Sequence, residues 1–165
     1  MLRTLTVTVP AAVLVLVAAL ASAAAAQRQA PLLTLPRATK AGQQTQYGSI
    51  HSLTRSGRGR YILRFDPAWF LTGYTASRAS LEDTGSPDVP NDYYIVDETH
   101  RLLSYVVPAV TPVTVLTRAT NTTKISVAAL ARRVRRGQEK GVGFWLLIGN
   151  KYPTPVLSID QPYRP

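Results

Sequence analysis

Residues Tyr47–Phe65 read YGSIHSLTRSGRGRYILRF, and this stretch gives the clearest prediction of the fold. Its first part has the period-two pattern of a β-strand. One set of alternating residues is Tyr47, Ser49, His51 and Leu53, and the other is Gly48, Ile50 and Ser52. Ser56–Gly59 suits a turn, because glycine adopts positive φ without strain. Tyr61–Phe65 then resumes as a strand. The stretch therefore predicts a β-hairpin, which Asp66-Pro67 is expected to end because proline cannot donate to a β-ladder.

Further short apolar runs predict more strands downstream of the hairpin. They do not alternate with helices in the rhythm of a parallel sheet, so antiparallel pairing is expected. One run is apolar almost throughout and should be a central strand. The expected strands are Tyr93–Val96, Leu102–Val107, Val113–Leu116, Phe144–Ile148 (the central one) and Val156–Ile159.

One helix has clear start and stop signals and is expected over Ser126–Arg136. Ser126 suits an N-cap, and Gly137 can end the helix in a left-handed conformation. The apolar residues fall on one face: Val127, Leu130, Ala131 and Val134. A second, short helix is expected around Ser77–Asp83, in a segment (Ala68–Ser80) that otherwise reads as a loop.

Together these elements predict a mainly β domain over residues 46–165. The expected architecture is a small antiparallel, OB-like barrel of about six or seven strands, with one amphipathic helix and a second short helix. An open α+β sheet with both helices on one face is the alternative. Residues 27–45 show little periodicity and are expected to form a flexible tether.

Residues 1–26 have the layout of a secretory signal peptide. Arg3 supplies a positive charge, Leu5–Leu20 is largely apolar, and small residues follow up to a cleavage site expected after Ala26. The domain is therefore expected to be exported, either secreted or associated with the cell envelope. An uncleaved N-terminal membrane anchor is the alternative, because the apolar stretch can reach across a bilayer if its alanines are counted.

Composition narrows the classes of partner. The 165-residue chain carries 19 Lys and Arg against 9 Asp and Glu, for a formal net charge of +10, and it has no cysteine. Disulfides and lipid anchoring through cysteine are thereby excluded. A basic exported domain is attracted to anionic wall polymers or to a membrane surface, although the charge can also serve solubility alone.

The charged face of the Ser126–Arg136 helix is the candidate binding site. Arg132, Arg133, Arg135 and Arg136 lie opposite its apolar face, and Lys140 follows just beyond. These residues predict an anion-binding stripe, and the solvated back of a packed helix is the alternative. Nucleic acid is not expected as a partner, since aromatic residues are not interleaved with the arginines. We expect a monomer that needs no cofactor.

Catalytic signatures are absent from the sequence. His51 and His100, the two histidines, have no partners at metal-ligand spacing, and no G-x-S-x-G run occurs. No catalytic, metal or cofactor residue is therefore assigned, and a non-enzymatic binding module of unknown ligand is favoured. The alternative is a small secreted hydrolase whose site is assembled from distant residues, with one histidine beside a serine and a carboxylate in a cleft.

Four motifs carry a resemblance to a known group of proteins. They are Phe65–Gly73 (FDPAWFLTG), Pro90–Val96 (PNDYYIV), Gly143–Trp145 and Ile159–Pro165 (IDQPYRP). Over about Tyr47–Pro165 the chain resembles an uncharacterised group of small exported proteins of high-GC Gram-positive bacteria. Many of these look like lipoproteins, from which this chain departs by lacking the cysteine. The resemblance implies one exported domain with a barrel-like core, and it transfers no catalytic residue or substrate.

The same motifs also predict structural contacts. Gln161 is expected to tie the C-terminal tail to the sheet. Tyr93 and Tyr94 should point to opposite faces of their strand, because side chains alternate along a β-strand. Asn91–Tyr94 and Tyr163 are expected to form one cluster.

Overall fold

The expected hairpin is the longest strand pair in the computed structural model, which describes residues 40–98, 101–118, 121–150 and 155–162. These residues all belong to one unit, Leu33–Pro165. β1 (Gln44–Arg55) and β2 (Arg60–Thr72) pair antiparallel, from Tyr47 opposite Ala68 to Arg55 opposite Tyr61. The hairpin prediction is confirmed, and β1 begins two residues before residue 46, the expected start of the domain.

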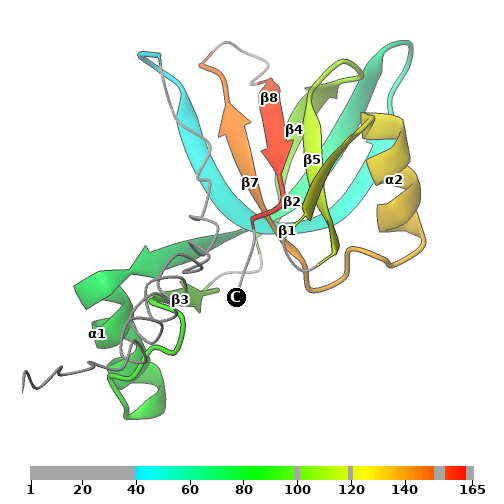
Figure 1. Cartoon of the computed structure of the whole chain (residues 1–165). Coiled ribbons are helices and arrows are strands. Elements are labelled where there is room, and N and C mark those ends of the chain that lie inside the picture. Colours follow the sequence, from blue (N-terminus) through cyan, green and yellow to red (C-terminus); the bar gives the residue numbers. More distant parts are fainter. Residues whose placement is uncertain (1–39, 99–100, 119–120, 151–154, 163–165) are drawn as a thin grey trace, which may run out of the picture. The chain divides into compact units, whose positions relative to one another are not determined.

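The described part of the chain contains eight strands and two helices, so the mainly β fold class is confirmed (Figure 1). After β2, the elements in chain order are α1 (Gly73–Thr84), β3 (Tyr93–Val96), β4 (Leu103–Pro108), β5 (Val113–Arg118), β6 (Asn121–Ile125), α2 (Val127–Arg135), β7 (Gly143–Ile148) and β8 (Val156–Asp160). The signal peptide expected at 1–26, and the tether as far as residue 39, lie outside the described residues. Within the described ranges, no helix has the length and apolarity needed to cross a bilayer.

The strands form one sheet in the order β3-β2-β1-β7-β8-β5-β6, and β4 pairs with the first half of β2. Every pairing of named strands is antiparallel except that of β5 with β8. An isolated parallel bridge from Val106 to Pro155 brings β4 beside the start of β8. The sheet does not close, so the expected barrel is only approximate.

The expected end of the second strand at Asp66-Pro67 is wrong, because β2 continues to Thr72. On one side of β2, β4 pairs with residues 60–65 and β3 pairs with residues 69–72. On this side of β2, Pro67 lies in the interval between the two partners, so its missing N–H interrupts neither the β3 nor the β4 ladder. Trp69–Thr72, expected in a loop, therefore form the part of β2 that holds β3.

β6 was not expected from the sequence. Its residues, Asn121–Ile125, pair with β5, and four of the five are exposed. An exposed strand carries no alternation of apolar and polar residues, so periodicity gives no signal for it. Its β-branched threonines were the remaining indication of a strand.

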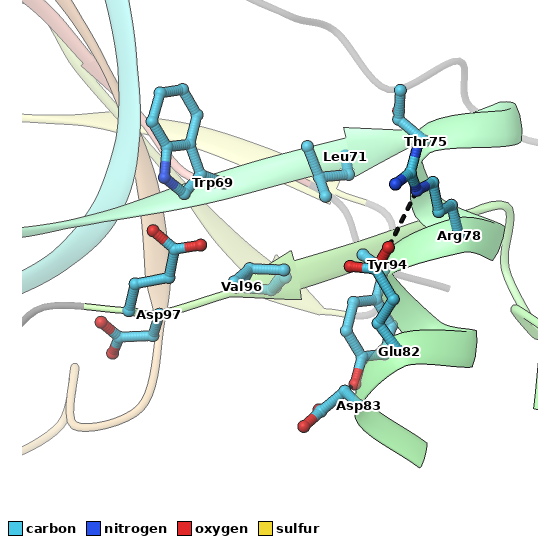
Figure 2. Close-up of a pocket in the computed structure, with 12 residues that line it drawn as sticks. Trp69, Leu71, Thr75, Arg78, Glu82, Asp83, Tyr94, Val96 and Asp97 are labelled. Carbon is cyan, nitrogen blue, oxygen red and sulfur yellow. Dashed lines mark hydrogen bonds and ion pairs between the residues drawn. The ribbon is translucent and has the colours of Figure 1, made fainter. Parts of the chain in front are cut away.

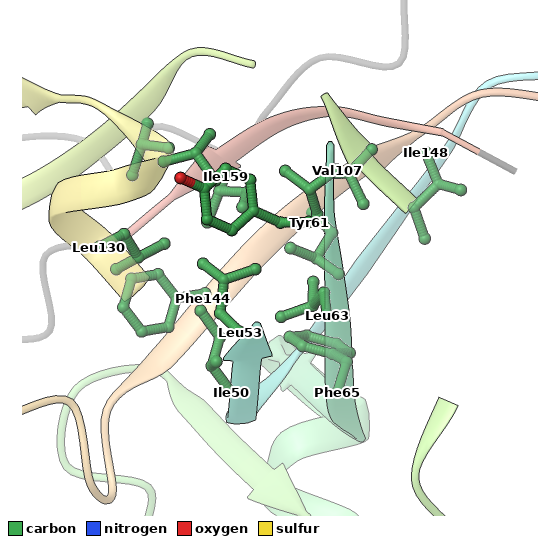
Figure 3. Packing of buried hydrophobic residues seen from close by; sticks show 14 of the residues in the cluster. Ile50, Leu53, Tyr61, Leu63, Phe65, Val107, Leu130, Phe144, Ile148 and Ile159 are labelled. Carbon is green, nitrogen blue, oxygen red and sulfur yellow. The ribbon is translucent and has the colours of Figure 1, made fainter. Parts of the chain in front are cut away.

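The core lies between the curled sheet and α2 (Figure 3). Phe65, Phe144, Leu130 and Leu146 are each 0% exposed. β7, the expected central strand, has β1 and β8 as its two neighbours, which confirms its position. The apolar face of α2 contributes Val127 and Leu130 to this core, as the helical periodicity predicted.

A β-bulge interrupts β1 at His51. Ile50 lies opposite Phe65 and Ser52 lies opposite Arg64, so His51 is an extra residue without a counterpart on β2. The unbroken period-two alternation expected here is therefore wrong. Ile50 and Leu53, three residues apart, are both buried as a result, and His51 is exposed. Bulges of this kind redirect a side chain away from the regular pleat.

Both ends of α2 form as expected. Ser126 Oγ accepts a hydrogen bond from the Ala129 N–H at 3.2 Å. At the other end Gly137 has a φ of +72°, its N–H donates to the Val134 carbonyl, and the Gln138 N–H donates to the Arg133 carbonyl. This pair of bonds is the Schellman motif, which satisfies carbonyls that the last turn leaves open. The short helix expected at Ser77–Asp83 is confirmed within α1.

The C-terminal tail is tied to the sheet through Gln161. Its Oε1 accepts from the Leu116 N–H at 3.0 Å, and its own N–H donates to the Thr114 carbonyl at 2.9 Å. The expected role of Gln161 is thus confirmed. Tyr163, expected to cluster with Asn91–Tyr94, lies outside the described residues.

Candidate functional site

A groove of about 570 Å³ lies between β1 and α2 and holds part of the expected arginine stripe. Arg132 and Arg135 reach it from α2, and Arg55 reaches it from the end of β1. All three side chains are exposed, and His51 lies at the same groove. None of the described residues that line it carries a carboxylate. We call this surface the basic groove.

A smaller groove of about 340 Å³ continues from it and contains Lys140. The two grooves share His51 and Val134, so they adjoin at the bulge of β1. The bulge thus places an imidazole between the arginines of α2 and the lysine that follows the helix. Four cationic side chains, Arg55, Arg132, Arg135 and Lys140, lie along this continuous surface.

Arg133 has a structural role instead. Its Nε donates to Glu139 Oε1 in an ion pair, and Glu139 is only 2% exposed. A buried carboxylate needs a cation and hydrogen bonds to offset its lost hydration. Arg133 supplies both, so it fastens the Gly137–Lys140 turn to the helix. Arg136, the C-cap of α2, is exposed and lines neither groove.

The sequence analysis missed Arg55 as a member of the site. It lies more than seventy residues before α2 in the chain, and only the packing of α2 against β1 brings it to the groove. No local pattern marks it, because an arginine at the exposed end of a strand is ordinary surface composition.

Replacing Arg133 by glutamine is expected to lower the free energy of unfolding by about 2 kcal/mol, because it leaves the Glu139 carboxylate buried without its cation. Urea unfolding of Arg133→Gln, Glu139→Gln and the double variant measures the loss. The double variant should recover part of it, since two neutral amides need no charge compensation. Parental stability for Arg133→Gln would contradict a structural role for this ion pair.

The smaller groove also tests the hydrolase alternative, because Ser49, His51 and Glu139 all line it. This is the set of residue types that an assembled hydrolytic site requires. Within the described residues, however, no hydrogen bond joins these three side chains, and the Glu139 carboxylate accepts its hydrogen bond from Arg133. His100, the other candidate histidine, lies outside the described residues. The described ranges contain no cluster of three His, Cys, Asp or Glu residues suited to a metal ion.

Comparison of the chain with protein-family models, with curated proteins and with solved structures gave no match. The resemblance to small exported proteins of high-GC Gram-positive bacteria therefore stays a prediction.

Proposed function

We propose that this protein is an exported, non-enzymatic binding module that holds an anionic component of the cell envelope in the basic groove. The observation that carries the proposal is the convergence of Arg55, Arg132 and Arg135 on one groove without a lining carboxylate. The layout of residues 1–26 supports export, and export supports an envelope partner.

The helix dipole alone does not account for this arrangement. Cations in the last turn of a helix are favourable because they offset the partial negative charge of its C-terminus. That explains Arg132, Arg133 and Arg135, all in the last turn of α2. It does not explain Arg55, which comes from a different strand and meets Arg132 and Arg135 at the groove. Three like charges gathered without a carboxylate repel one another, and an anionic ligand relieves that repulsion.

The shape of the site favours a polymer over a flat membrane. Guanidinium groups bind phosphate and carboxylate through two parallel hydrogen bonds, a geometry suited to anions that enter between them. A groove with arginines on both walls matches an anionic chain lying along it. A membrane presents its charges in a plane and would engage exposed residues outside the groove equally, Arg136 among them.

Changing Arg132 and Arg135 to glutamine is expected to weaken envelope binding about tenfold, or about 1.4 kcal/mol. Binding is measured by co-sedimentation of the purified protein with isolated cell envelopes across a salt series, and it should fall as salt rises. The same measurement with vesicles of anionic lipid distinguishes binding to a membrane surface from binding to a wall polymer.

The matched control is Arg58→Gln with Arg101→Gln, which removes the same charge from two exposed residues that line neither groove. Equal loss in both double variants would mean that net charge drives binding and the groove does not. Absence of binding at low salt would overturn the proposal. Binding to vesicles as strong as to envelopes would replace the polymer with a membrane surface.

The hydrolase alternative has one supporting observation, the meeting of Ser49, His51 and Glu139 in the smaller groove. It ranks second because a Ser–His–acid relay needs hydrogen bonds among its members, and Glu139 is paired with Arg133. Ester hydrolysis abolished by both Ser49→Ala and His51→Ala would reverse this order.

A further inference from the structure

Trp69 lies on the second half of β2 and is not part of the basic groove. Its side chain is 63% exposed, whereas Phe70 beside it packs against three other rings. An exposed indole leaves a large apolar area in water, which an occupant could cover. Trp69 lines two adjoining grooves, one of about 710 Å³ beside α1 and one of about 700 Å³ beside β1 and β7.

The groove beside α1 has acidic residues, but two of them are engaged by the protein itself (Figure 2). Tyr94 donates from its hydroxyl to Asp83, a bond that raises the pKa of Tyr94. Arg78 donates from Nε to Glu82 Oε1 at 2.8 Å. Figure 2 places Trp69 and Asp97 at one end of this groove and Arg78 at the other. The carboxylates therefore do not define a site by themselves.

The groove beside β1 and β7 has aromatic walls. Tyr47, Phe70 and Trp145 pack in a cluster with ring centroids 5.0 to 5.5 Å apart. Trp69 and Tyr105 extend this lining, so five aromatic side chains face one cavity. We call it the aromatic groove. Its volume falls within the roughly 300–1,000 Å³ typical of small-ligand sites.

Polar groups along the aromatic groove can both donate and accept hydrogen bonds. Gln46 Oε1 accepts from the Tyr105 hydroxyl at 2.6 Å, and burial raises the pKa of Tyr105, which keeps that hydroxyl protonated. Within the described residues the Gln46 amide makes no further side-chain hydrogen bond. Gln44 and Glu98 add another amide and a carboxylate to the lining.

Trp145 adds a donor that the protein leaves unused. Its Nε1 is buried, and it has no hydrogen-bond partner in the described part of the chain. A buried donor without an acceptor costs about 1–3 kcal/mol, so such groups are rare and call for an explanation. Trp145 lines the aromatic groove, but Nε1 itself is covered, so an acceptor on a bound ligand would reach it only after a neighbouring side chain shifts.

We infer that the aromatic groove binds a neutral β-1,4-linked oligosaccharide. Pyranose rings with equatorial substituents present flat C–H faces that stack on aromatic rings such as the exposed indole of Trp69. Their hydroxyls donate to a carboxylate such as Glu98 and exchange bonds in both directions with the amides of Gln44 and Gln46. A proline-rich peptide also suits aromatic grooves, but it has few N–H groups with which to replace the water that bonds the exposed Glu98 carboxylate.

The inference goes beyond the proposed function and can be tested separately, because the aromatic and basic grooves share no lining residue. Chitohexaose, cellohexaose and xylohexaose are titrated into the purified protein by calorimetry and by tryptophan fluorescence. At least one should bind, and Trp69→Ala should weaken it at least tenfold. Trp145→Phe keeps an aromatic ring without the N–H and should weaken it about threefold to tenfold.

The control is Tyr74→Ala, an exposed aromatic that lines neither groove and should leave sugar binding unchanged. Unfolding midpoints of all variants establish that lost binding does not reflect lost folding. Failure of all three sugars to bind, or equal binding by Trp69→Ala, would overturn the inference. Tighter binding of a decaproline peptide, abolished by Trp69→Ala, would replace the sugar with a peptide.

Discussion

Replacing Gly48 by alanine is expected to lower the free energy of unfolding by about 3 kcal/mol, as overpacking at a fixed backbone position does. Gly48 lies at the centre of the sheet, opposite Pro67 on β2 and Phe144 on β7. A methyl group on its Cα would lie 2.8 Å from Phe65 Cε1 and closer still to the Asp66 carbonyl oxygen. That oxygen belongs to the backbone of β2, which is paired on both sides of the clash and cannot move aside as a side chain would.

Urea unfolding followed by tryptophan fluorescence measures the loss, with Gly149→Ala as the matched control. Gly149 also lacks a left-handed φ, and the nearest atom to an added methyl there is Pro155 Cγ, at 3.3 Å. The control should change stability by well under 1 kcal/mol. If Gly48→Ala were as stable as the control, β2 would not pass so close to β1 at this point.

Replacing Phe144 by alanine is expected to cost about 3–5 kcal/mol, the range for a fully buried aromatic side chain. Phe144 is 0% exposed and lies on β7, the strand between β1 and β8. Figure 3 shows its ring beside Leu130 of α2. The residue therefore joins helix to sheet, and the cavity left by alanine would weaken both.

Chemical denaturation with the m-value fitted freely tests this second prediction. The midpoint should fall sharply while m stays near the parental value, because the surface exposed on unfolding changes little. Tyr74→Ala, with a side chain that is 82% exposed, is the aromatic control and should cost less than about 0.5 kcal/mol. A loss below 1 kcal/mol for Phe144→Ala would place β7 outside the core.

The elements that sequence could predict are those with local signals. α2 has a capping serine, a terminating glycine and a helical apolar face, all within the twelve residues Ser126–Gly137. The hairpin has its own glycine turn. By contrast, Pro67 lies in mid-strand at the interval between the β4 and β3 ladders on one edge of β2. That condition depends on distant residues, so the proline was interpreted as an end.

For the candidate sites too, local signals predicted some residues, and tertiary packing added the others. Helical periodicity placed Arg132 and Arg135 on one face, but Arg55 joins them only through tertiary packing. Arg133 was assigned to the same stripe because its partner, Glu139, lies six residues on, beyond the end of the helix, where i±4 spacing does not reach. The aromatic groove draws on β1, β2, β4 and β7, and no spacing along the chain could have assembled it.

The position of β8 has a consequence for when the molecule can fold. The β5–β6 hairpin joins the sheet only through β8, which lies between β7 and β5 and is the last strand in the described residues. During synthesis, that hairpin therefore has no sheet partner until residue 160 has emerged. Completion of the sheet waits on non-local pairings, which form slowly.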